Sequence, residues 1–286
     1  EISECLVGSE MCIRDRVCIA VMLGILSAAI YAENESGDSF IGLMYHQVLK
    51  DESRAGKYII TPGELESDLA YLSENGYVSV LPSQLVKIRE QGGRLPEKTV
   101  VITFDDGYET GLYYVLPLLK KYGMKAVINV VGSYTDEYSR INEEGKHLSY
   151  AYLTWNEIKK LSDSGYVEIG NHTYNMHSNN VERNGCARKE NESDEQYRTV
   201  LYEDVARLSD KLQRVTGKRP VAFAYPFGSL SEGSAEIIGS AGISVFMTCC
   251  EQPCSMNRNG RIVINRYNRE SGRSAQQICE EFNNAF

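Results

Sequence analysis

The chain has 286 residues, of which 42% are hydrophobic and 24% are charged, and its formal net charge is −9 at pH 7. This composition is typical of a globular protein and excludes disordered and collagen-like chains. An acidic chain without a cluster of lysine and arginine residues binds nucleic acid and anionic membrane surfaces poorly, so we expect no nucleic-acid partner. The length would allow two domains, although α/β barrels of this size often form a single unit.

Residues 1–32 have the features of two segments outside the folded domain. Residues 11–16 (MCIRDR) back-translate to a sequence that resembles a transposon end used in sequencing libraries, so we interpret residues 1–16 as a translated adapter. Residues 17–32 contain a short apolar core that follows two arginines and precedes a polar stretch, which is typical of a secretory signal peptide. An uncleaved segment would be a membrane anchor, and a buried core helix is a further alternative. We expect one domain over residues 38–286.

Five cysteines follow the expected signal segment. They are Cys186, Cys249, Cys250, Cys254 and Cys279. An odd number outside the cytoplasm leaves at least one free thiol or an intermolecular bond. Whether the remaining cysteines form a local disulfide or stay as free thiols is left open by the sequence.

From Phe40 onward, segments with the pattern of strands alternate with segments with the pattern of helices. Short apolar runs predict strands at residues 40–46, 99–104, 126–131, 167–170, 221–226, 243–248 and 261–265. Capping boxes and apolar residues at helical spacing predict helices at residues 61–76, 112–122, 154–164, 200–212 and 275–282. The polar segment 179–196 is expected to be a surface loop. This alternation predicts an α/β fold with a mostly parallel sheet, either open or closed into a barrel.

Polar residues follow four of these strands, at the edge where α/β folds place their functional sites. These residues are His46, the Asp105–Gly107 turn, Asn171 with His172, and the segment Pro226–Gly228. His177 lies five residues after His172. Two imidazoles and one carboxylate would leave open positions on a divalent cation, as a hydrolytic site requires. A solvated Asp-Asp-Gly turn is the alternative interpretation of the aspartate doublet.

The chain contains TFDDGY (Thr103–Tyr108), HTYNMH (His172–His177) and AYPFG (Ala224–Gly228) in this order, with MYH (Met44–His46) ahead of them. Together these motifs resemble the polysaccharide deacetylases of carbohydrate esterase family four. The similarity covers about residues 40–250. The wide histidine spacing and the early Tyr-His pair resemble the branch that includes poly-N-acetylglucosamine deacetylases.

The resemblance implies a single deformed (β/α) barrel of the polysaccharide deacetylase type. It also implies a divalent cation, zinc or another first-row metal, held by Asp106, His172 and His177. The corresponding activity is that of a metal-dependent polysaccharide N-deacetylase, a hydrolase that acts on carbon–nitrogen bonds other than peptide bonds.

The resemblance further implies roles for the other motif residues. Asp105 would be the general base that takes a proton from the attacking water. His46 would be the general acid that protonates the leaving amine, with a hydrogen-bonded structural histidine as the alternative. Tyr225 and Pro226 would lie at the substrate, and a backbone N–H near Phe227 would stabilise the oxyanion together with the metal charge.

The sequence departs from the family pattern at several positions. Many members carry an arginine at the position of Ala224, where it orients the catalytic aspartate, and a tyrosine at the position of Phe227. No histidine follows His177, so a late family histidine is missing, which is consistent with His46 as the acid. Arg266 is a candidate for the missing guanidinium, although a solvated arginine near the end of the chain is the more common case.

We expect a secreted or cell-surface monomer that removes N-acetyl groups from an N-acetylglucosamine-containing extracellular or cell-wall polysaccharide. Its partner would be this glycan, and it would contact a membrane only through an uncleaved anchor. One alternative is a glycan-binding relative with weak catalysis, which the alanine at position 224 favours and the retained Asp105 opposes. Another is an O-acetyl esterase with the same metal site, because fold and metal do not distinguish amides from esters.

Overall fold

The structure is a computed structural model that describes residues 38–141, 147–180, 183–256 and 260–284. The segments interpreted as an adapter (1–16) and as a signal peptide or anchor (17–32) lie outside the described residues. Every element below belongs to the unit Ser39–Phe286. Within the described ranges, no helix is both long enough and apolar enough to span a bilayer.

A mostly parallel sheet forms the centre of this unit. Its strands are β1 (Ser39–Tyr45), β4 (Val78–Ser79), β5 (Thr99–Phe104), β6 (Ala126–Val130), β7 (Val167–Asn171), β8 (Ala222–Ala224), β9 (Val245–Met247), β10 (Cys254–Ser255), β11 (Ile262–Ile264) and β12 (Tyr267–Asn268). The path runs β10-β1-β5-β6-β7-β8-β9-β11, with β12 paired to β1 and β4 paired to β5. Only the β1–β10 pair is antiparallel among the described strands of this sheet. A separate parallel pair joins β2 (Gln47–Val48) to β3 (Ile59–Ile60).

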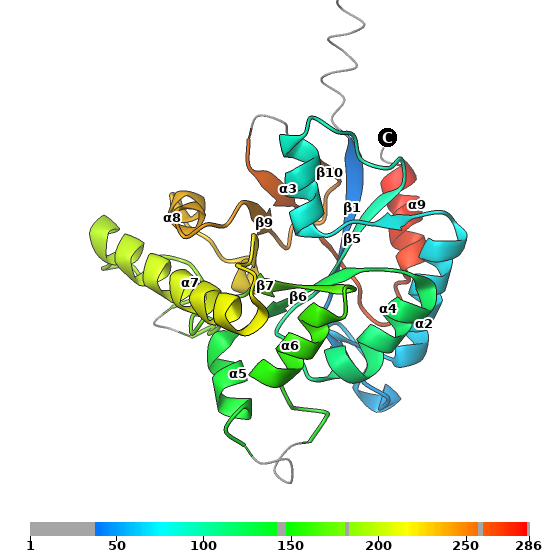
Figure 1. Cartoon of the computed structure of the whole chain (residues 1–286), viewed down its shortest axis with the longest axis horizontal. Helices are drawn as coiled ribbons and strands as arrows, with labels where there is room; N and C mark the ends of the chain where they lie inside the picture. Colours follow the sequence, from blue (N-terminus) through cyan, green and yellow to red (C-terminus); the bar gives the residue numbers. More distant parts are fainter. Residues whose placement is uncertain (1–37, 142–146, 181–182, 257–259, 285–286) are drawn as a thin grey trace, which may run out of the picture. The chain divides into compact units, whose positions relative to one another are not determined.

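Helices pack around the sheet (Figure 1). They are α2 (Pro62–Glu74), α3 (Pro82–Glu90), α4 (Leu116–Tyr122), α5 (Gly132–Tyr138), α6 (Trp155–Asp163), α7 (Asp194–Thr216), α8 (Ser234–Ser240) and α9 (Ala275–Asn284). Shorter helical turns are η1 (Glu52–Arg54), the π-helical turn η2 (Gly111–Val115) and η4 (Pro226–Gly228). In this arrangement α2 packs against α4 and α9, and α7 packs against α6 and α8.

The central strand β5 explains why the sheet is so apolar. All six of its residues are buried. Val100 and Ile102 belong to the core cluster that also contains residues of α2 and α4, whereas Val101 belongs to a second cluster with residues of β8, β9 and β11. A strand that is covered on both faces needs apolar residues at successive positions, which is why the run TVVITF does not alternate with polar residues.

The expected alternation of strands and helices is present, with corrections at the boundaries. The capping boxes at Thr61 and Thr154 start α2 and α6 as predicted. The expected loop 179–196 ends earlier, because Ser193 accepts a hydrogen bond from the Gln196 N–H and thereby begins α7 at Asp194. The strand expected at residues 221–226 is shorter, because Pro226 starts the turn η4. The sequence patterns did not predict α3 or α5.

The segment 262–268, just before α9, connects the two edges of the sheet. β11 pairs with β9 on one side, and β12, which follows two residues later, pairs with β1 on the other. This closing segment, residues 262–268, passes so close to β1 that a Cβ atom at Gly42 would lie 2.3 Å from the backbone oxygen of Asn265. Glycine at this position therefore permits the sheet to curl into a nearly closed barrel.

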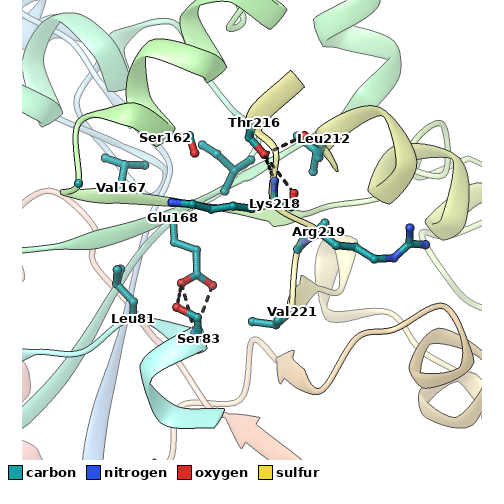
Figure 2. Close-up of a pocket in the computed structure, with 13 residues that line it drawn as sticks. Leu81, Ser83, Ser162, Val167, Glu168, Leu212, Thr216, Lys218, Arg219 and Val221 are labelled. Atoms are coloured by element: carbon teal, nitrogen blue, oxygen red, sulfur yellow. Dashed lines mark hydrogen bonds between the residues drawn. The ribbon is translucent and has the colours of Figure 1, made fainter. Parts of the chain in front are cut away.

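A cavity of about 330 Å³ lies at the amino ends of β7 and β8, and Figure 2 shows its lining. Glu168 of β7 accepts hydrogen bonds there from the backbone N–H and the hydroxyl of Ser83, near the start of α3. A carboxylate at a helix N-terminus satisfies free N–H groups and interacts favourably with the helix dipole. The Glu168 carboxylate of this cavity thus fixes α3 to the barrel.

The sequence did not decide between disulfides and free thiols for its last five cysteines. All five carry free thiols in the structure. Cys186, Cys254 and Cys279 are buried, whereas Cys249 and Cys250 are exposed. Disulfides therefore make no contribution to holding together the described part of the chain.

Gly42→Ala should destabilise the fold by about 1–3 kcal/mol, because the added methyl group would overlap the Asn265 carbonyl and force the closing segment away from β1. Urea unfolding followed by circular dichroism measures this free energy. Gly56→Ala is the matched control, since no heavy atom lies within 4 Å of a Cβ atom at that position. Equal stability of the two variants would contradict close packing at Gly42.

Candidate active site

Three side chains from two strand ends meet at the carboxyl edge of the sheet. Asp106 follows β5, His172 follows β7, and His177 completes the turn after β7. His177 Nε2 lies 3.1 Å and His172 Nε2 lies 3.5 Å from Asp106 Oδ1. One potential ligand atom from each residue lies within 4.8 Å of the others. The structure therefore brings together the three side chains predicted to hold the cation.

The orientation of the two imidazoles fits a metal. His172 Nδ1 lies 2.8 Å from the carbonyl oxygen of Ala224, so Nδ1 carries the proton and donates it. In the neutral ring this leaves a lone pair on Nε2, which faces Asp106. His177 Nδ1 lies 3.3 Å from the Tyr134 hydroxyl, which can accept a hydrogen bond from it while donating its own to the His177 carbonyl oxygen. Two nitrogen atoms and one carboxylate oxygen form a donor set that suits zinc and other first-row divalent cations.

Three residues of this edge adopt left-handed backbone conformations. Asp106 has φ 70°, Thr173 has φ 72° and Phe227 has φ 59°, and they are the non-glycine residues with positive φ in the described chain. Such conformations are unfavourable for residues other than glycine, and they cluster at functional sites where the surrounding structure enforces them. Each of the three lies at the carboxyl end of a strand, in a motif selected from the sequence.

Asp105 lies deeper than Asp106 and is only 3% exposed. The Asn129 side-chain amide and Arg266 Nη1 both donate hydrogen bonds to its Oδ1, each over 2.8 Å. Burial alone would raise the pKa of this carboxyl, but the Arg266 guanidinium and nearby His172 hold it well below its usual range. The carboxylate is therefore ionised and fixed in orientation.

Arg266 places a guanidinium beside Asp105, which the alanine at position 224 cannot supply. Its side chain is 0% exposed, so the interpretation as a solvated arginine was wrong. Besides Asp105, it donates hydrogen bonds to the Thr103 hydroxyl and to the Thr248 carbonyl oxygen. Arg266 directly follows the strand-like run 261–265, so the same strand-end signal that selected the other site residues also applied to it.

Asn129 had no signal in the sequence analysis. It lies within β6, and its side chain crosses towards Asp105 because Gly170 on the neighbouring β7 leaves space. A Cβ atom at Gly170 would lie 1.9 Å from Asn129 Oδ1. The asparagine and the glycine therefore form a pair that only the strand register brings together.

A cavity of about 550 Å³ opens onto these groups. His46, which follows β1, lines it together with the two aspartates and the two histidines. Burial lowers the pKa of His46, while the charges of Asp105 and Asp106 oppose this shift. The His46 ring contacts the edge of Tyr58, with ring centroids 4.8 Å apart.

The segment after β8 also reaches the cavity. Phe227 is 48% exposed and its ring centroid lies 4.7 Å from that of His177. Pro226 is buried beside it and begins the turn η4. Tyr225 also lines the cavity, but its hydroxyl lies 3.4 Å from the Ser234 hydroxyl in α8.

The other tyrosines beside the motifs differ in their surroundings. The Tyr45 hydroxyl donates to Asp68 and the Tyr174 hydroxyl donates to Asp136, so both are used in packing. Tyr108 lines the cavity and stacks on Tyr152. Further cavity residues that the sequence analysis did not select are Lys57, Tyr58, Cys249, Glu251 and Asn268.

Residues 92–246 match the family described as polysaccharide deacetylase. The chain belongs to this family. A relative named poly-β-1,6-N-acetyl-D-glucosamine N-deacetylase, from Escherichia coli K12, is 26% identical over 230 residues, which are 74% of this chain and 34% of the relative. A Staphylococcus aureus MRSA252 relative with the same name is 23% identical and aligns over 80% of this chain and 77% of its own length. The chain thus spans about a third of the Escherichia coli relative.

Solved structures of this family share the fold. A de-N-acetylase from Aggregatibacter actinomycetemcomitans superposes with a TM-score of 0.71 at 27% identity, covering 85% of this chain and 99% of that one. IcaB from Ammonifex degensii gives a TM-score of 0.68 at 26% identity, covering 86% and 97%. The predicted deformed (β/α) barrel and the resemblance to the poly-N-acetylglucosamine deacetylase branch are therefore confirmed.

Arg266→Met should destabilise the metal-free protein by about 3–5 kcal/mol, because it leaves the buried charge of Asp105 without its partner. Adding Asp105→Asn to this variant should restore part of the loss, since the unpaired charge is then removed. Urea unfolding of the two single variants and the double variant measures the coupling. Arg261→Met is the control, because the Arg261–Glu236 pair is exposed to solvent and its loss should leave the free energy of unfolding almost unchanged. Additive losses would contradict the pairing.

Proposed function

We propose that this chain is a metal-dependent hydrolase that removes N-acetyl groups from an N-acetylglucosamine-containing polysaccharide outside the cytoplasmic membrane. The observation that carries this proposal is the meeting of Asp106, His172 and His177 beside an ionised, buried Asp105 at one cavity. The names of the Escherichia coli and Staphylococcus aureus relatives support poly-β-1,6-N-acetylglucosamine as the first substrate to test.

Asp106, His172 and His177 would hold the cation, and three protein ligands leave positions for water and substrate. Zinc is the first candidate because two nitrogen atoms and one carboxylate oxygen are among its usual ligands. When bound, a divalent cation polarises the acetamide carbonyl and lowers the pKa of water.

Asp105 would accept a proton from the attacking water as the water oxygen bonds to the acetamide carbon. Arg266 and Asn129 both donate to Oδ1, so Oδ2 is the oxygen that would receive the proton. Because both donors hold the carboxyl group in place, it would not have to reorient during the reaction.

His46 would donate a proton to the amide nitrogen as the carbon–nitrogen bond breaks, which releases acetate and leaves an amine on the glycan. A structural histidine uses its ring nitrogens in hydrogen bonds, and the buried His46 Nδ1 has no hydrogen-bond partner in the described residues. This supports the acid role over the structural alternative. The backbone N–H of Phe227, held by Pro226 and Tyr225, would stabilise the developing oxyanion.

The alternative of a glycan-binding protein with weak catalysis explains less. A buried carboxylate and guanidinium lose several kcal/mol of hydration each, and a cavity that only binds sugar has no need for this ion pair behind its metal ligands. An O-acetyl esterase would use the same groups, so acetylated esters belong among the substrates to test.

The zinc-loaded protein should release acetyl groups from one of three glycans: poly-β-1,6-N-acetylglucosamine oligomers, peptidoglycan fragments or chitin oligomers. Asp105→Asn should lower turnover at least about 100-fold, the usual contribution of a general base, and still bind zinc. Mass spectrometry of the glycans measures acetyl loss, and metal analysis measures zinc. Full activity of Asp105→Asn would refute its role as base, and release only from O-acetylated glycans would favour the esterase.

His46→Ala should slow hydrolysis of the amide by about 100-fold, because the amine leaves poorly without a proton. An activated aryl acetate should lose much less rate, since its leaving group needs no proton. His147→Ala is the control, because this histidine is exposed and lies outside the cavity lining. Equal losses on amide and ester would count against His46 as the general acid.

A further inference from the structure

The two histidines of the candidate metal site are separated by a short turn whose backbone is strained. Thr173, directly after His172, has φ 72°. A β-branched residue in this region is an outlier, and such a conformation persists only where the surroundings enforce it. Within the segment, Asn171 Oδ1 accepts a hydrogen bond from the Thr173 N–H, and the Thr173 hydroxyl accepts one from the Met176 N–H. The distance between His172 and His177 depends on these bonds and on the groups that hold the turn from outside.

Backbone groups of α5 hold one side of the turn. The Gly132 N–H donates to the Thr173 carbonyl oxygen over 3.1 Å, and the Ser133 N–H donates to the Tyr174 carbonyl oxygen over 2.7 Å. These contacts fix the carbonyl groups of the turn. The backbone N–H groups of the turn are therefore held by partners other than α5.

One side chain of α7 holds the opposite side. Asp204 Oδ1 accepts a hydrogen bond from the Tyr174 N–H over 2.7 Å, and Asp204 Oδ2 accepts one from the Asn175 N–H over 2.8 Å. Burial raises the pKa of Asp204 to about 6, against the effect of these two donors and of Arg207, so the carboxyl is ionised at neutral pH. Hydrogen bonds to an ionised acceptor are about twice as strong as neutral ones.

The α7 helix is itself fixed to the strand that carries the turn. The Asn171 side-chain amide, at the end of β7, donates to the Val205 carbonyl oxygen and to the Ser209 hydroxyl. Arg207, one turn after Asp204, places its guanidinium carbon 3.7 Å from the Tyr174 ring centroid. Asp204 therefore acts from a rigid support rather than from a mobile surface helix.

We propose that Asp204 is a positioning residue that sets the geometry of His172 and His177 for a divalent cation. It touches neither the cation nor the substrate. It acts through two of the N–H groups between the histidines, those of Tyr174 and Asn175, and keeps the turn in its strained form. This inference rests on the metal site of the proposed function, and it adds a residue that lies outside the matched motifs.

The test measures zinc affinity by competition with a chelating dye, using the protein with and without substitutions in α7. Asp204→Ala should weaken zinc binding about 10- to 100-fold, the usual effect of losing a group that orients metal ligands. Asp204→Asn should cause a smaller loss, because its amide accepts one N–H and opposes the other. Asp210→Ala is the matched control, since Asp210 lies on the same helix and pairs only with exposed groups of Arg219.

The visible spectrum of the cobalt-loaded protein reports the coordination geometry and should change in both Asp204 variants. Unchanged zinc affinity and an unchanged cobalt spectrum, with only a lower unfolding midpoint, would overturn the inference and leave the proposed function intact. His177→Ala should abolish binding. If it binds zinc like the unsubstituted protein, or if that protein binds none, the metal site itself fails and the inference fails with it. Should Asp204→Ala not fold, Asp204→Asn decides alone.

Discussion

The buried ion pair between Asp105 and Arg266 is the interaction on which the rest of the site depends. The two residues are 161 positions apart in the chain, and both side chains are buried. A buried charge without a partner is strongly unfavourable, so Asp105 can stay ionised inside the barrel only if the closing segment lies against β1. Closure of the barrel and ionisation of Asp105, the proposed base, therefore depend on the same contact between the closing segment and β1.

A second condition concerns the carboxyl edge of the sheet, where the chain leaves its strands in unfavourable backbone conformations. Asp106, Thr173 and Phe227 each turn sharply there, and α5 and α7 hold the turn that contains Thr173. The parallel register brings these turns together around one cavity, which explains how residues from three distant motifs can share a ligand-sized space. Rigid strands on one side and α7 on the other leave the imidazoles little freedom.

Much of this organisation was predictable from the sequence, because strand ends of a parallel sheet share an edge. The Asp105–Asp106 doublet, His172 and His177 could be grouped on that argument, whereas the choice of Asp106 as the metal ligand came from the resemblance to the family. Capping boxes gave the starts of α2 and α6. The fold type followed from the motifs. Local sequence patterns do not distinguish a buried Arg266 from a solvated one, because burial of an arginine depends on a long-range partner. Asn129 and Asp204 had no local signal, since strand register and helix packing alone bring them to the site. α3 and α5 are short, and α3 depends on Glu168 from a distant strand.

The chain order of the ion pair has a consequence for biosynthesis. Asp105 emerges from the ribosome long before Arg266. A nascent chain that ends between His177 and Arg266 therefore has the ligand motifs after β5 and β7 but no guanidinium beside Asp105. Contacts of such wide sequence separation form late in folding because they require closure of a long loop. The Asp105–Arg266 pair can therefore form only after the closing segment has docked, which ties the charge state of the site to completion of the barrel.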